Sequence, residues 1–242
     1  MEAGRETASR VQRVRHELKR RDVEVVKVAP LGAHFVAVTF HGEDLADFVS
    51  ASFDDHVKFI FDDASGEQVR RDYTPRRYDP TARELTIEFA LHGDGKASAW
   101  ARQAAAGQRV TIGGPRGSMI VPADYGWHLL AGDATALPAI RRRLEELPAG
   151  VRATVVIACD DAVTLASAAR LDVRQVADGA ALVDAIRAMP LPGEDAFVWF
   201  GGEASVAAQV RDVVHGEKGF PRSASRISAY WKQGASDHHE DL

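Results

Sequence analysis

WHLLAGDATALPAIRRRLEEL, residues 127–147, is the stretch that decides the fold. It starts with a short apolar run at residues 128–131, of the kind that forms a buried strand. A glycine follows, and then a helix-like segment that continues to Leu147. A second apolar run occupies residues 151–158. Strand, helix and strand in this order predict a βαβ unit and a parallel sheet that is buried on both faces.

The same alternation continues along the second half of the chain. Further strands are expected at residues 171–176, 197–200 and 226–231, and further helices at residues 163–169, 180–189 and 204–214. Strands that alternate with helices are typical of doubly wound α/β domains. We therefore expect a doubly wound parallel-sheet domain over residues 124–234.

Residues 22–123 have a different pattern. Short runs rich in β-branched and aromatic residues are separated by turn signals, at residues 23–28, 34–40, 56–61, 69–74, 84–90 and 109–112. One helical segment, residues 96–106, interrupts them. Many short strands with such punctuation predict an antiparallel barrel or sandwich. The first 21 residues carry a basic run that we interpret as a helix or a leader, and residues 235–242 form a polar tail.

Composition narrows the possible partners. The formal net charge of −5 argues against nucleic acid, whose binding domains are strongly basic. The single cysteine, Cys159, makes neither a disulfide framework nor a zinc cluster, so we expect no metal ligands. The N-terminus has no apolar segment of a signal peptide, and no apolar stretch is long enough for stable membrane insertion. These features predict a cytoplasmic protein.

Arg71-Asp72-Tyr73-Thr74-Pro75-Arg76 is the most informative polar stretch. It ends a predicted strand, so Arg71 and Tyr73 share one face. A tyrosine ring can stack on a flat conjugated system, an arginine can bind phosphate through two hydrogen bonds, and Thr74 can hydrogen-bond a ring nitrogen. The alternative is a polar strand end that faces solvent.

Two glycine-rich segments follow. His92-Gly93-Asp94-Gly95 precedes a helix that contains Ala97 and Ser98, and free N–H groups at a helix start can bind a diphosphate. The second segment, residues 113–118, ends in Gly117-Ser118, where glycine permits close approach of a ligand to the backbone. A plain loop with Ser98 as a helix cap, and a tight turn between domains, are the alternatives.

These motifs, in their order and spacing, resemble the siderophore-interacting protein family. The resemblance also includes residues 55–58, 132–139, 199–204 and 230–234, and spans about residues 22–234. It implies a Greek-key β-barrel that binds FAD, followed by a domain that binds a nicotinamide nucleotide. The implied activity is ferric-siderophore reduction, with NADH or NADPH as electron donor and Fe(II) as the released product.

The resemblance also implies roles for individual residues. Arg71, Tyr73 and Thr74 match the flavin-binding signature, and His92, Gly93, Ala97 and Ser98 match the segment around the FAD phosphates. Further positions match cofactor-binding segments: Gly117, Ser118, Asp133, Thr135, Ala136, Gly202, Glu203 and Trp231. The basic positions thought to receive an anionic iron chelate are Lys58, Arg116 and Lys232.

A flavin suits this reaction because it takes two electrons from a nicotinamide and releases them one at a time to iron. The cofactor carries the difficult step and the protein binds and orients it, so we expect no catalytic side chain. Hard oxygen donors of a siderophore bind Fe(III) far better than Fe(II), so reduction frees the metal. A general flavin oxidoreductase with another acceptor, or a non-catalytic siderophore-binding protein, are the alternatives.

The choice of electron donor stays open. Cys159-Asp160-Asp161 follows the second predicted α/β strand, and an acidic residue there binds a ribose hydroxyl and repels a 2′-phosphate. Arg170 and Arg174 are close in sequence and can bind such a phosphate. Some family members accept electrons from ferredoxin. Trp231 is either a neighbour of the flavin or an interface aromatic.

Overall fold

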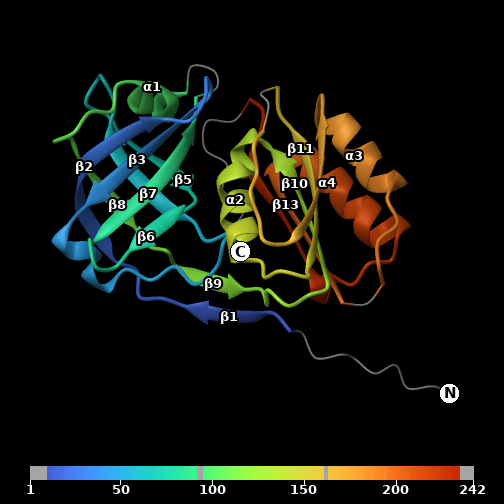
Figure 1. Cartoon of the computed structure of the whole chain (residues 1–242). Coiled ribbons are helices and arrows are strands. Elements are labelled where there is room, and N and C mark those ends of the chain that lie inside the picture. Colours follow the sequence, from blue (N-terminus) through green and yellow to red (C-terminus); the bar gives the residue numbers. More distant parts are fainter. Residues whose placement is uncertain (1–9, 92–94, 161–162, 194, 235–242) are drawn as a thin grey trace.

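The computed structural model describes residues 10–91, 95–160, 163–193 and 195–234 of the 242-residue chain. Two sheets of different type lie side by side, with one helix between them (Figure 1). The expectation of an antiparallel barrel domain followed by a doubly wound parallel-sheet domain is confirmed. In the described residues, no helix has the length and apolar character that a membrane span requires.

The first sheet is antiparallel and strongly curled, and its strands follow the order β5-β4-β8-β2-β3-β7-β6. Its strands are β2 (Arg20–Pro30), β3 (Phe35–His41), β4 (Val57–Asp62), β5 (Gln68–Tyr73), β6 (Arg77–Asp79), β7 (Glu84–Ala90) and β8 (Arg109–Gly113). A short 3₁₀ helix, η1 (Glu43–Asp47), follows β3. The helix α1 (Lys96–Arg102) covers one end of this half-barrel (Figure 1).

Alternating burial along the strands shows that one face of this sheet packs on a core. Val38 and Phe40 on β3, and Ile87 and Phe89 on β7, are fully buried, while Thr39 and Thr86 are partly exposed. Strands that bury every second residue form a sheet with one face on a core. Trp100 of helix α1 packs on the same core, where its ring contacts Phe59.

The second sheet is parallel, with the strand order β12-β11-β10-β13-β14. Its strands are β10 (Trp127–Asp133), β11 (Arg152–Ala158), β12 (Arg170–Val176), β13 (Ala196–Glu203) and β14 (Ser225–Trp231). The helix α2 (Leu137–Glu146) covers the face toward the barrel domain, and α3 (Gly179–Ala188) and α4 (Ala204–Arg211) cover the other (Figure 1). The short 3₁₀ helices η2 (Ala134–Ala136) and η4 (Arg222–Ala224), and the π-helical segment η3 (Asp212–Glu217) that continues α4, complete the domain.

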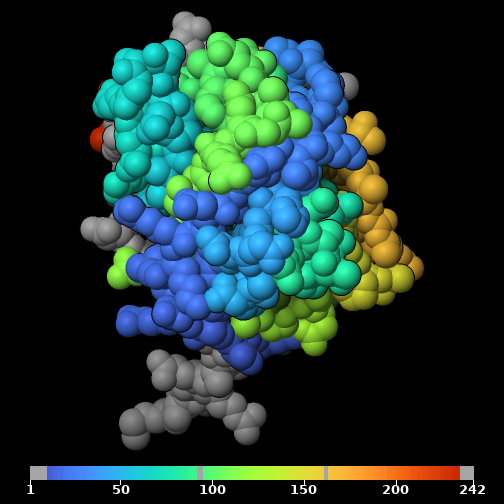
Figure 2. Space-filling model, turned by 90° about the vertical axis from the view of Figure 1, so that its left-hand side faces the viewer, coloured from blue at the N-terminus to red at the C-terminus, as the bar shows by residue number. Residues whose placement is uncertain are grey.

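The prediction of an N-terminal helix is wrong for the described part of residues 1–21. Gln12–Arg15 forms β1, which pairs antiparallel with β9 (Gly117–Ile120), and β2 begins at Arg20. All four residues of β1 are exposed, so backbone pairing stabilises this segment rather than an apolar stripe. Figure 2 looks onto the barrel domain, where these N-terminal residues (blue) lie against the rest of the barrel.

Three basic residues of this N-terminal segment, Arg10, Lys19 and Arg21, form ion pairs with acidic residues. Arg10 pairs with Asp124 and Asp195 and lies over the Tyr125 ring, 4.1 Å from its centroid. Arg21 is nearly buried and pairs with Asp47 at 2.8 Å. The basic run therefore anchors the start of the chain to both domains.

The helix predicted at residues 163–169 is absent, and these residues form neither a helix nor a strand. Val163 and Leu165 are half-buried, while Thr164 and Ala166 are exposed, an alternation of period two. The Ser167 hydroxyl donates to the Leu144 carbonyl oxygen at 2.6 Å. This hydrogen bond fixes the segment to the C-terminal part of helix α2.

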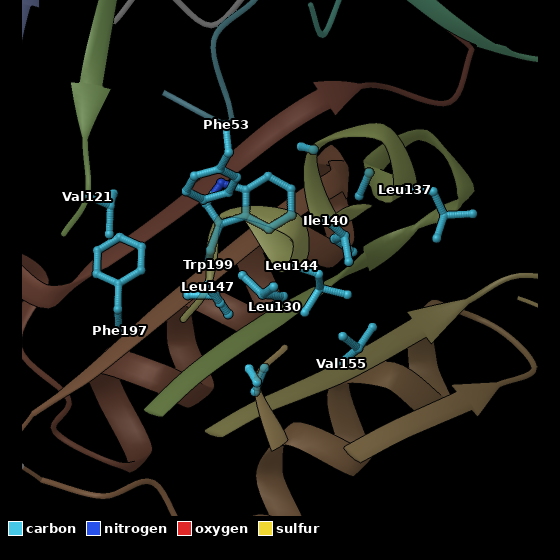
Figure 3. Packing of buried hydrophobic residues seen from close by; sticks show 14 of the residues in the cluster. Phe53, Val121, Leu130, Leu137, Ile140, Leu144, Leu147, Val155, Phe197 and Trp199 are labelled. Carbon is cyan, nitrogen blue, oxygen red and sulfur yellow. The ribbon is translucent and has the colours of Figure 1, made fainter. Parts of the chain in front are cut away.

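A shared apolar core joins the two domains. Phe53, from the loop before β4, packs edge-on against Trp199 of β13, with ring centroids 5.5 Å apart. Figure 3 shows these two rings beside Leu137, Ile140 and Leu144 of α2. We call this contact region between the domains the seam.

Candidate functional site

The carboxyl ends of β10 and β13 form the first part of the candidate site. The two strands are neighbours, and the chain leaves β10 toward α2 on one face and β13 toward α4 on the other. Such a topological switch point is where open α/β sheets bind their ligands. Residues 132–136, 201–205 and 230–233 meet at this edge, which we call the switch-point edge.

Asp133 is the centre of the switch-point edge. Its Oδ1 accepts hydrogen bonds from the backbone N–H and the hydroxyl of Thr135, at 2.9 and 2.5 Å. Its Oδ2 accepts from the backbone N–H of Glu203 at 3.0 Å and from the Trp231 indole Nε1 at 2.9 Å. One carboxylate thus connects the ends of three strands, so the residues predicted here are brought together.

Close packing at this edge leaves room only for glycine at positions 132 and 202. A Cβ on Gly132 would lie 2.2 Å from the Gly201 carbonyl oxygen, and a Cβ on Gly202 would lie 2.7 Å from Oδ2 of Asp133. Real Cβ atoms do not approach backbone or carboxylate oxygens so closely. Both glycines therefore allow β10 and β13 to end side by side, and Gly202 keeps the Asp133 carboxylate accessible to its partners.

Glu203 caps helix α4. Its Oε2 accepts from the backbone N–H groups of Ser205 at 2.6 Å and Val206 at 3.2 Å, and Oε1 accepts from that of Gln233 at 3.3 Å. Desolvation acts in the opposite direction, but the hydrogen bonds from Ser205, Gln233 and Val206 hold the pKa of Glu203 below its ordinary value. The Glu203 carboxylate thus borders the edge beside the exposed Trp231.

Two of the residues predicted at this edge have different exposures. Thr135 is partly exposed, whereas Ala136 is fully buried in the seam core. The Ala136 side chain therefore packs into the seam core and supports the turn, while Thr135 faces the site.

The strand end at Tyr73 and Thr74 forms the second part of the candidate site. The Tyr73 ring packs against Phe89 at 4.4 Å and Phe59 at 5.9 Å between centroids, which raises the pKa of its hydroxyl through burial. Among the described residues, neither the Tyr73 hydroxyl nor the nearly buried Thr74 hydroxyl has a hydrogen-bond partner. Arg71 is partly exposed on the same face of β5 and donates to the Arg70 carbonyl oxygen at 2.7 Å.

Helix α1 lies beside this strand end. Gly95 precedes it, and none of the described side chains caps its N–H groups. Ala97 is buried in the barrel core, and the Ser98 hydroxyl donates to the Ala90 carbonyl oxygen at 3.1 Å, which fixes α1 to the end of β7. The predicted residues His92 and Gly93 lie outside the described residues.

Gly117 and Ser118 have partners within the protein. A Cβ on Gly117 would lie 2.6 Å from the Val14 carbonyl oxygen, so glycine permits the pairing of β1 with β9. The buried Ser118 hydroxyl donates to Asp55 Oδ2 at 2.7 Å and contacts His16 Nε2 at 2.8 Å. Burial raises the pKa of Asp55, against the hydrogen bonds that its carboxylate accepts. In this structure both predicted residues therefore hold strand β9 in place.

The three basic positions predicted for a chelate come from three segments. Lys58 lies on β4 and pairs with Asp72 across to β5 at 2.7 Å. Arg116 is exposed in the turn before β9, and Lys232 is exposed directly after Trp231. Each is at least partly accessible to solvent.

Sequence reasoning missed a group of charged residues in the seam. Arg76 pairs with Glu88 at 3.1 Å and with Glu145 of α2, and Arg141 pairs with Glu88 at 2.6 Å. The signal was present as three consecutive arginines, residues 141–143, inside an otherwise apolar helix start. The sequence alone does not show which residues pair with these arginines.

Comparison with known proteins identifies the family. A model described as "Siderophore-interacting protein" matches residues 125–234, and one described as "Siderophore-interacting FAD-binding domain" matches residues 24–70 and 63–119. The chain belongs to the siderophore-interacting protein family. The matched segments cover both parts of the candidate site, the barrel strand end and the switch-point edge.

Relatives and solved structures of this family match over nearly the whole chain. The chain is 36% identical to the NADPH-dependent ferric-chelate reductase of Escherichia coli, over 91% of this chain and 96% of that protein. It is 28% identical to the ferric vibriobactin reductase ViuB of Vibrio cholerae, over 90% and 92%. The structure of a siderophore utilization protein from T. fusca superposes with a TM-score of 0.87 at 31% identity, covering 94% and 99%.

The residues present fit an FAD molecule. The ring of Tyr73, the Thr74 hydroxyl and the Arg71 guanidinium offer stacking, hydrogen-bonding and phosphate-binding groups on one strand end. The backbone N–H groups at the start of α1 add donors next to them. The chemistry of this donor set matches a flavin nucleotide.

Proposed function

We propose that the chain is an FAD-dependent reductase that passes electrons from a nicotinamide nucleotide to ferric siderophores and releases Fe(II). The observation that carries the proposal is the 36% identity to a ferric-chelate reductase across both domains at once. A match confined to the barrel would support flavin binding alone. The match also covers the switch-point edge, where a nucleotide donor would bind.

The barrel domain holds the flavin in this proposal. Tyr73 stacks on the ring system, Thr74 donates a hydrogen bond to it, and Arg71 pairs with the diphosphate. The start of α1, near Ala97 and Ser98, supports the diphosphate through backbone N–H groups. When bound, FAD accepts two electrons from the nicotinamide and delivers them singly to iron.

The switch-point edge orients the nicotinamide nucleotide. Asp133 and Glu203 are carboxylates held by several donors, so their positions are defined before any ligand arrives. Thr135 and Trp231 present a hydroxyl and an aromatic edge beside them. NADPH is the donor that the identity to the NADPH-dependent relative supports, with NADH and ferredoxin as the alternatives to test. The reaction is proposed to take place in the cytoplasm, where reduced nicotinamide is available.

Lys58, Arg116 and Lys232 attract the anionic iron chelate. The protein is acidic overall, with a net charge of −5, so these side chains provide local positive potential that the whole molecule lacks. Replacement of all three with alanine should slow ferric-chelate reduction much more than reduction of a neutral dye. Equal losses would favour a general flavin oxidoreductase.

The decisive experiment combines absorbance and iron trapping. Purified protein, reconstituted with FAD, should show flavin absorbance that bleaches when NADPH or NADH is added without oxygen. Addition of a ferric siderophore should restore the colour and yield trapped Fe(II). Protein that cannot be reconstituted with FAD contradicts the proposal. Tight chelate binding without Fe(II) from either nucleotide or from reduced ferredoxin identifies a siderophore-binding protein.

A further inference from the structure

Helix α2 contacts the barrel domain through three consecutive arginines. Arg141 donates to Glu88 Oε2 at 2.6 Å, Arg142 reaches two loops of the barrel, and Arg143 donates to the Pro122 carbonyl oxygen at 2.6 Å. Consecutive helical residues point about 100° apart, so three in a row cover about 200°. The helix between the domains in Figure 1 is therefore held by polar contacts on several sides.

Arg142 makes the most specific of these contacts. Its Nη1 donates to the Ser50 hydroxyl and to the Pro75 carbonyl oxygen, both at 2.8 Å, and its Nη2 donates to the Ser50 carbonyl oxygen at 3.0 Å. Its Nε donates to Glu146 of the same helix at 3.1 Å. The guanidinium is a rigid planar fork, so these bonds define the position of both loops relative to α2.

The side chain that follows Pro75 is held by the same helix. Arg76 donates through Nη1 to Glu145 at 3.0 Å, and its Nε pairs with Glu88 of β7 at 3.1 Å. The side chains of Arg76 and Glu88 are only 9% and 8% exposed, which reduces the screening of this pair by solvent. Residues 74–76 are thus fixed to α2 through a backbone carbonyl and a side chain.

The other end of α2 begins at the switch-point edge. The helix starts at Leu137, directly after the turn η2 that Asp133 caps. Its ten residues form a rod about 15 Å long at 1.5 Å per residue. One rigid element therefore connects the edge that receives the nucleotide with the strand end that receives the flavin.

We propose that Arg142 is a positioning residue, which fixes residues 74–76 to α2 and thereby sets the separation between the flavin and the nicotinamide nucleotide. This inference rests on the proposed function, because it takes the two binding places from it. Reacting atoms must lie about 3–3.5 Å apart, and a displacement of about 1 Å can cost about 100-fold in rate. The effect of Arg142 is therefore expected in electron transfer between the two ligands rather than in the binding of either one.

The test compares FAD-loaded protein with its Arg142→Gln variant. The limiting rate of anaerobic flavin reduction by NADPH should fall about 10- to 100-fold, because the donor and acceptor are misaligned. The half-saturating NADPH concentration, the Kd for FAD and the rate of reoxidation by ferric chelate should each change by no more than about twofold. Arg142→Lys should recover only part of the lost rate, since an ammonium cannot reproduce the fork.

A measurement on FAD-free protein separates positioning from chemistry. Hydrogen exchange at the Arg76 amide, which donates to the Thr86 carbonyl oxygen at 2.9 Å, should accelerate in Arg142→Gln. Arg187→Gln is the matched control, because Arg187 pairs with Asp184 and Glu217 on the helix layer away from the barrel. It should change neither the exchange rate nor the flavin reduction rate.

Glu145→Gln provides a second variant if Arg142→Gln folds poorly. It removes one charge from the pair with Arg76 and should lower the limiting reduction rate in the same direction, by a smaller factor. A wild-type limiting rate in both variants overturns the inference while the proposed function stands. A loss of rate that saturating FAD restores also overturns it, since Arg142 would then serve flavin binding. Failure of the wild-type protein to bind FAD defeats the proposed function itself and the inference with it.

Discussion

The two faces of the parallel sheet are covered in different ways. On the outer face, α3 and α4 pack on Phe200, Val198 and their neighbours, and the buried Thr154 is satisfied by the Trp127 indole at 3.1 Å. The seam face carries the buried charged groups Asp54 and Arg143 and the buried imidazole of His128 within its apolar core. Apolar packing alone is sufficient to hold helices on a sheet. The charges on the seam face add directional contacts, which define how one domain sits on the other.

The largest effect should come from truncating an aromatic on each face. Trp199→Ala on the seam face and Phe200→Ala on the outer face should each lower the free energy of unfolding by about 3–5 kcal/mol. Only Trp199→Ala removes the contact with Phe53 and the indole hydrogen bond to Asp54 at 3.3 Å.

Urea titrations followed by two probes can distinguish the faces. Tryptophan fluorescence and far-ultraviolet circular dichroism should give coincident transitions for Phe200→Ala and separated transitions for Trp199→Ala, because the domains then unfold independently. Coincident transitions in both variants would show that the seam is not needed for cooperative unfolding.

The second prediction concerns the buried ion pair of the seam. Arg226 Nε lies 2.5 Å from Asp54 Oδ2, and the two side chains are 13% and 3% exposed. Arg226→Met should destabilise the protein by about 3 kcal/mol, because it leaves a buried carboxylate without its cation. The double variant Arg226→Met with Asp54→Asn should cost less than the sum of the two single variants, measured in a double-mutant cycle. Strict additivity would mean that the two groups do not interact.

The third prediction is that the stability of the protein depends on pH through His128 on the seam face. Burial, reinforced by the Arg143 guanidinium, lowers the pKa of His128 to about 3. In the unfolded chain histidine has a pKa near 6.5, so between these values the unfolded state binds a proton that the folded state does not. The stabilisation is present above about pH 6.5 and is lost as the pH falls toward 3, by up to about 1.4 kcal/mol per pH unit.

Replacement of this imidazole should remove that slope. In His128→Leu, the free energy of unfolding between pH 6 and pH 4 should decline less steeply than in the wild type, as measured by urea titration at each pH. The exposed His56, changed to Gln, is the control and should leave the slope unchanged. An identical slope in His128→Leu would assign the acid sensitivity to other groups.

The smallest effect concerns the barrel side of the seam. Tyr73 and Tyr78 are both half-buried on the barrel core, where Tyr78 packs on Phe48 with ring centroids 5.0 Å apart. Tyr73→Ala should weaken FAD binding about tenfold, the loss expected from one aromatic stacking contact. Tyr78→Ala should leave the Kd for FAD near its wild-type value in a fluorescence titration. Equal weakening in both would argue against a flavin at Tyr73.

Much of the fold could be predicted because its signals are local. The strand β7, predicted at residues 84–90, has those bounds, and the apolar runs at residues 128–131 and 151–158 lie in β10 and β11. The helix at residues 163–169 was wrongly predicted because composition outweighed an alternation of period two. The N-terminal helix was wrong because β1 depends on pairing with β9, which is about 100 residues away in the sequence.

In the candidate site, too, some features have local sequence signals and others depend on distant contacts. The resemblance to the family implied cofactor-binding roles for Asp133, Glu203 and Trp231. The structure brings the three together at the edge where the carboxyl ends of parallel strands meet. Ser118 was expected to face a ligand, but its hydroxyl contacts Asp55 and His16, whose positions no local pattern reveals. The predicted roles of the flavin-binding and chelate-binding residues stay predictions until the experiments above are made.

The sequence by itself determined which segments form strands and which polar residues stand at their ends, since hydrophobic period and turn chemistry act between near neighbours. It also carried enough ordered motifs to indicate the family. Only the tertiary structure decided that the arginines of α2 face the barrel and bind the loop after Thr74. A helical pattern tells which side of a helix is apolar, but the partner of a charged side chain depends on how two distant domains meet.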